Sequence, residues 1–107
     1  MTAVRKLSDP EIKDRLNNLN DWALDHGTLY REYKFNDFVT AFAFMTKVAQ
    51  AAEAMAHHPE WSNVYDTVKL HLSTHEVGGI SERDFDLAQK IDRIVVNMAL
   101  PGPDRGS

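Results

Sequence analysis

The stretch between residues 36 and 55 constrains the fold most strongly, because its apolar residues repeat with the 3.6-residue period of an α-helix. Asn36 or Asp37 can cap the start of this helix, and Pro59 prevents its continuation. A helix that lies on one sheet needs a single apolar stripe. This helix has two neighbouring stripes, of which one holds Phe38, Phe42, Met45, Ala49 and Ala52 and the other Phe44, Val48, Ala51 and Met55. We therefore expect a second partner for it, another helix or another subunit, and the spacing leaves open which stripe faces inward.

Two capping boxes predict a first and a last helix. Ser8 with Glu11, and Pro10 in the first turn, indicate a helix that ends between residues 17 and 20. Ser81 with Asp84 begins the last helix in the same way. Each helix has an apolar stripe, which consists of Ile12, Leu16 and Leu19 in the first and of Phe85, Leu87, Ala88, Ile91, Ile94, Val95 and Met98 in the last.

Two further segments have the pattern of β-hairpins. Residues 22–35 have a turn signal at His26-Gly27, and residues 61–74 have one near Asp66-Thr67. After the second turn, Val68, Leu70 and Leu72 alternate with Lys69, His71 and Ser73. The order of elements is therefore α-β-β-α-β-β-α, which predicts an α+β domain with a four-stranded antiparallel sheet.

Length and composition indicate one globular domain. The chain has 107 residues, of which 43% are hydrophobic and 26% are charged, close to the averages for globular proteins. We expect the domain to cover residues 1–100 and the tail of residues 101–107, rich in proline and glycine, to fray. The absence of cysteine excludes disulfides, thiolate zinc sites and thiol nucleophiles.

Charge and hydropathy exclude two classes of partner. The net charge is −4 and no cluster of lysine and arginine is present, which argues against direct binding of nucleic acid. No apolar run approaches the length of a membrane span, and no apolar segment of a secretory signal follows the first residues. We therefore expect a cytoplasmic protein.

Four of the five histidines lie close together in the sequence, at His57, His58, His71 and His75. Imidazole titrates near neutral pH, so a cluster of histidines suits proton transfer. His57 and His58 lie where the long helix gives way to an extended segment, so we expect their side chains to diverge. Glu53 is four residues before His57, and a carboxylate on the same helix face could orient that imidazole.

Simpler interpretations of these residues remain open at this point. The histidine pair could be a polar helix C-terminus that interacts with the helix dipole. Three histidines could bind zinc, although no HExxH or similar ligand spacing is present. His71 shares a strand face with Lys69 and Ser73, which favours exposure to solvent. Asp84 could have a purely structural role as the last residue of the Ser81 capping box.

The motif E-x-x-x-H-H-P-x-W at residues 53–61, with T-H-E at 74–76 and G-I-S-E-R-D-F at 79–85, resembles the pterin-4a-carbinolamine dehydratase family. The resemblance extends from Trp22 to about Met98. It implies a sheet with the helices on one face. It also implies an enzyme that converts 4a-hydroxytetrahydropterin into quinonoid dihydropterin and water during tetrahydropterin recycling, without a metal or an organic cofactor.

The resemblance also implies the residues of the site. The positions that match the family's catalytic pattern are Glu53, His57, His58, His75 and Asp84. The substrate-binding positions would be Trp22, His58, Pro59, Trp61, Ser73 and Thr74. On this interpretation His57 is the general acid and His75 acts on the other side of the ring. His58 binds or polarises the pterin, Glu53 holds an imidazole or a pterin N–H, and Asp84 combines capping with the orientation of a histidine. Which histidine carries out which proton transfer stays open at this point, since two of them could serve the two 4a epimers.

Partners follow from the same resemblance. Family members form dimers through their sheets and tetramers through their long helices, which would explain the second apolar stripe. Animal members also act as dimerization cofactors of a homeodomain transcription factor. The alternative function is therefore that of a protein–protein cofactor or transcriptional coactivator, with a nuclear location also expected if the source is an animal.

Overall fold

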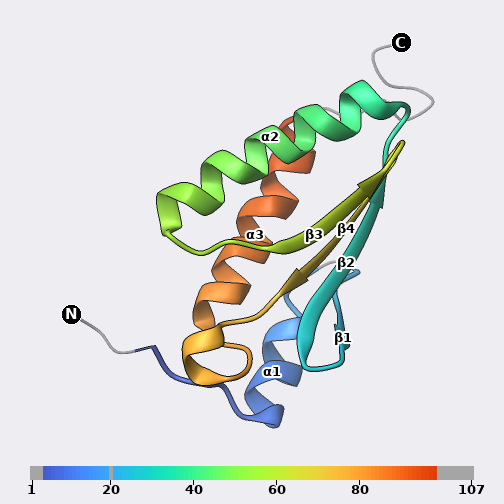
Figure 1. Ribbon diagram of the computed structural model, residues 1–107. Helices are drawn as coiled ribbons and strands as arrows, with labels where there is room; N and C mark the ends of the chain where they lie inside the picture. The colour runs from blue at the N-terminus through green and yellow to red at the C-terminus, as the bar shows by residue number, and fades with distance from the viewer. Residues whose placement is uncertain (1–3, 20, 99–107) are drawn as a thin grey trace.

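The computed structural model describes residues 4–19 and 21–98, and within them the chain has the predicted order of elements (Figure 1). The predicted domain end at residue 100 and the frayed tail at 101–107 lie outside the described residues. The elements are α1 (Asp9–Leu16), β1 (Ala23–Asp25), β2 (Thr28–Lys34), α2 (Phe38–Met55), β3 (Glu60–Val64), β4 (Thr67–Leu72), the 3₁₀ helix η1 (His75–Val77) and α3 (Glu82–Asn97).

Within the described residues, the four strands form one antiparallel sheet in the order β1-β2-β4-β3. The two hairpins are joined in the centre by the pairing of β2 with β4, in which Leu29 lies opposite Leu72. Helices α2 and α3 cover one face of the sheet (Figure 1). Val68, Leu70 and Leu72 are buried against these helices as the alternation predicts, and burial of each such side chain contributes about 1.5–3 kcal/mol.

The predicted caps and turns are confirmed. The Ser8–Glu11 and Ser81–Asp84 capping boxes are both formed, and Asp37 accepts a hydrogen bond from the Thr40 N–H at the start of α2. His26 and Gly27 form the first turn with φ values of 50° and 79°. Positive φ at both central residues matches the right-handed twist of the strands that the turn connects.

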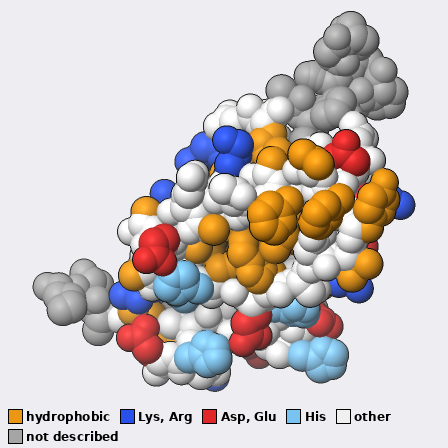
Figure 2. All heavy atoms as spheres, turned by 45° about the horizontal axis from the view of Figure 1, so that its top comes forward, with side chains coloured by type: hydrophobic (Ala, Val, Ile, Leu, Met, Phe, Trp, Pro, Cys, Tyr) orange, Lys and Arg blue, Asp and Glu red, His pale blue; other side chains and the backbone are white. Residues whose placement is uncertain are grey.

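The two apolar stripes of α2 have different environments. Ala41, Phe44, Val48 and Ala52 are buried, and Met45, Ala51 and Met55 are half-buried. Ala52, which the sequence pattern grouped with the Phe38 stripe, belongs instead with Val48 one helical turn before it. Phe38, Val39 and Phe42 remain 47%, 75% and 55% exposed. Figure 2 shows the resulting band of hydrophobic side chains on the face of the molecule that carries α2.

None of the helices in the described part of the chain is long and apolar enough to cross a membrane.

Candidate active site

The site begins at the C-terminal end of α2, where Ala56 has the left-handed conformation with φ 55° and ψ 39°. The His57 N–H donates to the Ala52 carbonyl, and the Ala56 N–H donates to the Glu53 carbonyl. These two bonds form a Schellman motif with alanine in the position that glycine usually occupies. The motif turns the chain sharply, so that His57 and His58 diverge as expected: His57 is 8% exposed, whereas His58 is exposed.

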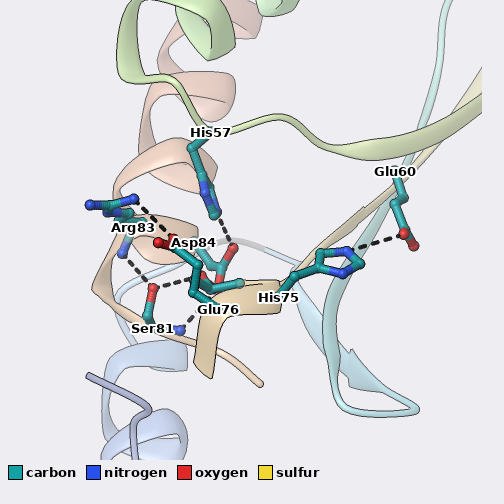
Figure 3. A network of polar contacts seen from close by, with 8 residues as sticks. His57, Glu60, His75, Glu76, Ser81, Arg83 and Asp84 are labelled. Carbon is teal, nitrogen blue, oxygen red and sulfur yellow. Dashed lines mark hydrogen bonds and ion pairs between the residues drawn. The ribbon is translucent and has the colours of Figure 1, made fainter. Parts of the chain in front are cut away.

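His57 points toward the start of α3 and contacts Asp84 (Figure 3). His57 Nε2 lies 2.6 Å from Asp84 Oδ1, and Asp84 has an exposed fraction of 0%. Asp84 Oδ2 accepts hydrogen bonds from the Thr74 hydroxyl at 2.8 Å and from the Ser81 N–H at 2.9 Å. A buried carboxylate with several donors around it is stabilised in the ionised form. Asp84 therefore combines helix capping with contact to a histidine.

Glu53 contacts the other histidine of the pair. Its Oε1 lies 2.9 Å from His58 Nε2, and both side chains are exposed. The expectation that Glu53 shares a helix face with His57 is therefore wrong. The reason is that α2 ends at Met55 and the left-handed Ala56 rotates His57 away from the helix face that carries Glu53. The sequence has no glycine at this position to indicate such a motif.

His75 lies on η1 and extends toward the sheet (Figure 3). Its Nε2 is 3.6 Å from Oε2 of Glu60, the first residue of β3, and both side chains are exposed. The sequence pattern did not single out Glu60, although it directly follows the His57-His58-Pro59 segment. A second exposed pair nearby joins Arg83 to Glu76 at 3.5 Å.

Trp22 is the predicted site residue that the structure places apart from the histidines. Its Nε1 donates to Asp92 Oδ1 at 2.9 Å, and Tyr33 and Arg31 contact the same carboxylate oxygen. Asp92 lies about two helical turns after Asp84 on α3. Trp22 is buried in this position.

The remaining predicted residues differ in their burial. Thr74 is buried in the Asp84 network, whereas Pro59, Trp61 and Ser73 are half-buried. His71 is half-buried on the sheet face away from α2 and α3, where its Nδ1 lies 3.0 Å from the Thr28 hydroxyl and its ring contacts that of Tyr30. His71 is therefore less exposed than the strand pattern suggests.

Among the residues that the structure describes, no group of three or more histidine, aspartate or glutamate side chains converges as metal ligands would. The arrangement instead offers a buried imidazole with a carboxylate on one ring nitrogen, and two exposed imidazoles that each have a carboxylate close by. Imidazole groups supported by carboxylates are suited to general acid and base catalysis.

Comparison with known proteins identifies relatives over most of the chain. Residues 5–94 match the model of the family described as pterin 4 alpha carbinolamine dehydratase. A protein of Solibacter usitatus named as a candidate pterin-4-alpha-carbinolamine dehydratase is 52% identical over 89 residues, which cover 83% of this chain and 94% of that protein. A Synechococcus protein with the same name is 53% identical over 88 residues, 82% of this chain and 95% of that protein.

A solved structure has the same architecture. The crystal structure of a protein from Brucella melitensis, described as a transcriptional coactivator/pterin dehydratase, superimposes with a TM-score of 0.80 at 40% identity. The match covers 83% of this chain and 97% of the Brucella chain. Together with the family match over residues 5–94, these similarities show that the chain belongs to the pterin 4 alpha carbinolamine dehydratase family.

Proposed function

We propose that the protein dehydrates 4a-hydroxytetrahydropterins to quinonoid dihydropterins. The observation that carries this proposal is the buried His57–Asp84 pair in a chain of the dehydratase family. In the reaction the bond between C4a and the hydroxyl oxygen breaks, and the oxygen takes up a proton and leaves as water. The proton on N5 is removed, and its bonding electrons form the C4a–N5 double bond. Histidine side chains can carry out both proton transfers near neutral pH.

We assign one role to each of these side chains, and the contacts of His57 and His58 support the assignment. His57 delivers the proton to the leaving hydroxyl, and its contact with Asp84 orients the ring for this transfer. His75 acts on the opposite side of the pterin ring, and His58 with Glu53 binds or polarises the pterin. The proposal assigns both proton transfers to side chains of this chain and needs no metal or organic cofactor for them.

The experiment that tests this proposal is a dehydration assay with 4a-hydroxytetrahydropterin after chelator treatment. The wild-type protein should turn over the substrate, and His57→Ala and His75→Ala should each lower the rate, with typical losses of about 10²–10⁴-fold for a general acid or base. His26→Ala, which removes an exposed histidine at the β1–β2 turn, is the matched control and should retain the wild-type rate. A double variant, His57→Ala with His75→Ala, that kept nearly normal activity would contradict the assignment.

The outer face of α2 supports a proposal about assembly. Phe38, Val39 and Phe42 are exposed large apolar side chains, and Ala43 beside them leaves a hollow lined only by apolar groups. Exposed apolar patches of this kind usually mark interfaces between proteins. We assign the outer face of α2, defined by Phe38, Val39 and Phe42, to contact with a second copy of the chain.

A second candidate function is that of a protein–protein cofactor for a transcription factor. The description of the Brucella protein as a transcriptional coactivator favours it, and the outer face of α2 offers an apolar surface for such a partner. Capture of a homeodomain protein by the wild-type chain, with loss of capture on Phe42→Glu, would support this function. Equal capture by the wild-type chain and by Phe42→Glu would argue against a role of this face.

A further inference from the structure

The strongest candidate for a further role is the pair of buried hydroxyl groups behind Asp84. Thr74 and Ser81 have exposed fractions of 1% and 0%, and their oxygens lie 2.7 Å apart. Thr74 also reaches Asp84 Oδ2, as described above. A buried carboxylate needs donors on its oxygens, because loss of hydration otherwise destabilises the charge. These hydroxyls therefore stabilise the charge of the Asp84 carboxylate and, through its contact with His57, the orientation of that ring.

The directions of the hydrogen bonds follow from counting protons. An ionised carboxylate only accepts, and a threonine hydroxyl has a single proton to donate. Thr74 therefore donates to Asp84, so the bond between the two hydroxyls must be donated by Ser81. The Ser81 oxygen in turn accepts from the Arg83 N–H at 3.2 Å. Asp84 Oδ2 thus accepts directly from the Thr74 hydroxyl and the Ser81 N–H, while the Ser81 hydroxyl donates to Thr74 and supports it from behind.

With Asp84 ionised, the same counting assigns the hydrogen atom in its contact with His57. Because Asp84 Oδ1 can only accept, the hydrogen atom in its contact with His57 belongs to Nε2. Among the described residues His57 Nδ1 has no hydrogen-bond partner, and no buried side-chain nitrogen or oxygen there lacks one. Nδ1 is therefore the ring atom of His57 that remains accessible from outside the protein.

We infer that Thr74 is a positioning residue of the site: with Ser81 it holds Asp84 ionised and fixes the hydrogen on His57 Nε2, so that Nδ1 is the atom that exchanges a proton with substrate. The assignment of a substrate to Nδ1 rests on the proposed function. In the dehydration step, protonated His57 gives its Nδ1 proton to the leaving hydroxyl as the bond to C4a breaks. His57 is then neutral and still donates to Asp84 from Nε2, and Asp84 keeps its charge throughout.

Nitrogen-15 NMR of the imidazole rings tests the inference directly in the wild-type protein. The His57 resonances, assigned by their loss in His57→Gln, should show a protonated Nε2 and, when the ring is neutral, an unprotonated Nδ1. Neutral His57 with its proton on Nδ1 would overturn the inference, whatever the activity of the protein.

Substitutions at Thr74 test the part played by the hydroxyl. Thr74→Val removes the hydroxyl but keeps the branched shape, and Thr74→Ser keeps the hydroxyl and is the matched control. We expect Thr74→Val to lose part of the Nε2–H signal and to lower kcat about 10–100-fold, the usual effect of removing a group that orients a functional histidine, with little change in KM. Thr74→Ser should restore both readouts. A folded Thr74→Val with the wild-type spectrum and kcat would overturn the role of Thr74.

The two proposals fail in different ways. If the wild-type protein does not dehydrate the pterin but shows Nε2–H at His57 and loses it in Thr74→Val, the proposed function is wrong and the network assignment stands. If the protein is an active dehydratase and the His57 signals do not depend on the Thr74 hydroxyl, the network assignment is wrong and the function stands.

Discussion

Polar side chains between the sheet and α3 form two separate hydrogen-bond networks, each built around one carboxylate. One joins His57, Thr74 and Ser81 to Asp84, and the other joins Trp22, Tyr33 and Arg31 to Asp92. In each network one carboxylate accepts several hydrogen bonds, so its burial is offset by donors from other elements. The second network holds Trp22, which the family resemblance would place near the substrate, against the middle of α3.

Because Tyr33 belongs to the Asp92 network, we expect the stability of the fold to decrease at alkaline pH. Burial of Tyr33, together with its hydrogen bond to Asp92, raises the pKa of the phenol above its usual value. The protonated phenol therefore stabilises the fold below the unfolded pKa of about 10, and this contribution is lost as the pH rises further. Tyr33→Phe should cost about 1.5–3 kcal/mol at neutral pH, since a hydrogen bond to a charged group is lost.

Urea unfolding at pH about 8 and about 11 measures this dependence, because the two values lie on either side of the ordinary tyrosine pKa. The wild-type midpoint should fall more than that of Tyr33→Phe, and Tyr65→Phe, which replaces an exposed tyrosine, is the control. Equal falls for the wild-type protein and Tyr33→Phe would exclude Tyr33 as the source.

At the scale of elements, the parts that the sequence predicts well are those with local causes. The capping boxes at Ser8 and Ser81 and the His26-Gly27 turn depend on side chains close in the sequence, and all three are present in the structure. The end of α2 is different, because its left-handed residue is Ala56 and no glycine indicates it. For this reason the sequence predicts the divergence of His57 and His58 but assigns Glu53 to the wrong histidine.

The left-handed alanine has a measurable cost. The left-handed conformation destabilises an L-residue by about 1–2 kcal/mol. Glycine has no such conformational cost, although it loses more chain entropy on folding. We therefore expect Ala56→Gly to stabilise the protein by about 0.5–1 kcal/mol. Ala54→Gly, within the last turn of α2, should instead destabilise it by about 1 kcal/mol. Thermal unfolding of the two variants should shift in opposite directions, and a destabilised Ala56→Gly would contradict the assignment of strain to this residue.

On the scale of the whole molecule, histidine side chains gather along the lower side of the face that Figure 2 shows, and an apolar band that includes the exposed side of α2 lies above them. The sequence predicts two stripes on this helix but not their orientation. Orientation depends on which side chains α3 and the sheet can cover, and that is decided by packing between elements distant in the sequence. For the same reason, local sequence patterns do not predict the carboxylates that contact His57 and His75. These carboxylates, Asp84 and Glu60, lie on other elements of the fold.

Charged substitutions on the two sides of α2 should have opposite effects. Phe38→Glu with Phe42→Glu should dissociate the proposed assembly into smaller species that remain folded, because these side chains are exposed within one chain. Phe44→Glu with Val48→Glu should prevent folding, because both side chains are completely buried and an unpaired charge there has no partner. Light scattering and circular dichroism measure the two outcomes, and a wild-type monomer at micromolar concentration would exclude the assembly.

The strand order β1-β2-β4-β3 has a kinetic consequence. Each hairpin closes locally, but the central ladder joins residues such as Leu29 and Leu72, between which the whole of α2 must first be placed. Closing such a long loop is entropically costly before its contacts form, so the central ladder should limit the folding rate. Leu70→Ala, in β4, should therefore slow folding, whereas Leu7→Ala, in the segment that joins Ile80, should mainly accelerate unfolding. The two arms of a denaturant chevron separate these effects, and a variant at Leu70 that changed only the unfolding arm would place the β2–β4 pairing after the rate-limiting step.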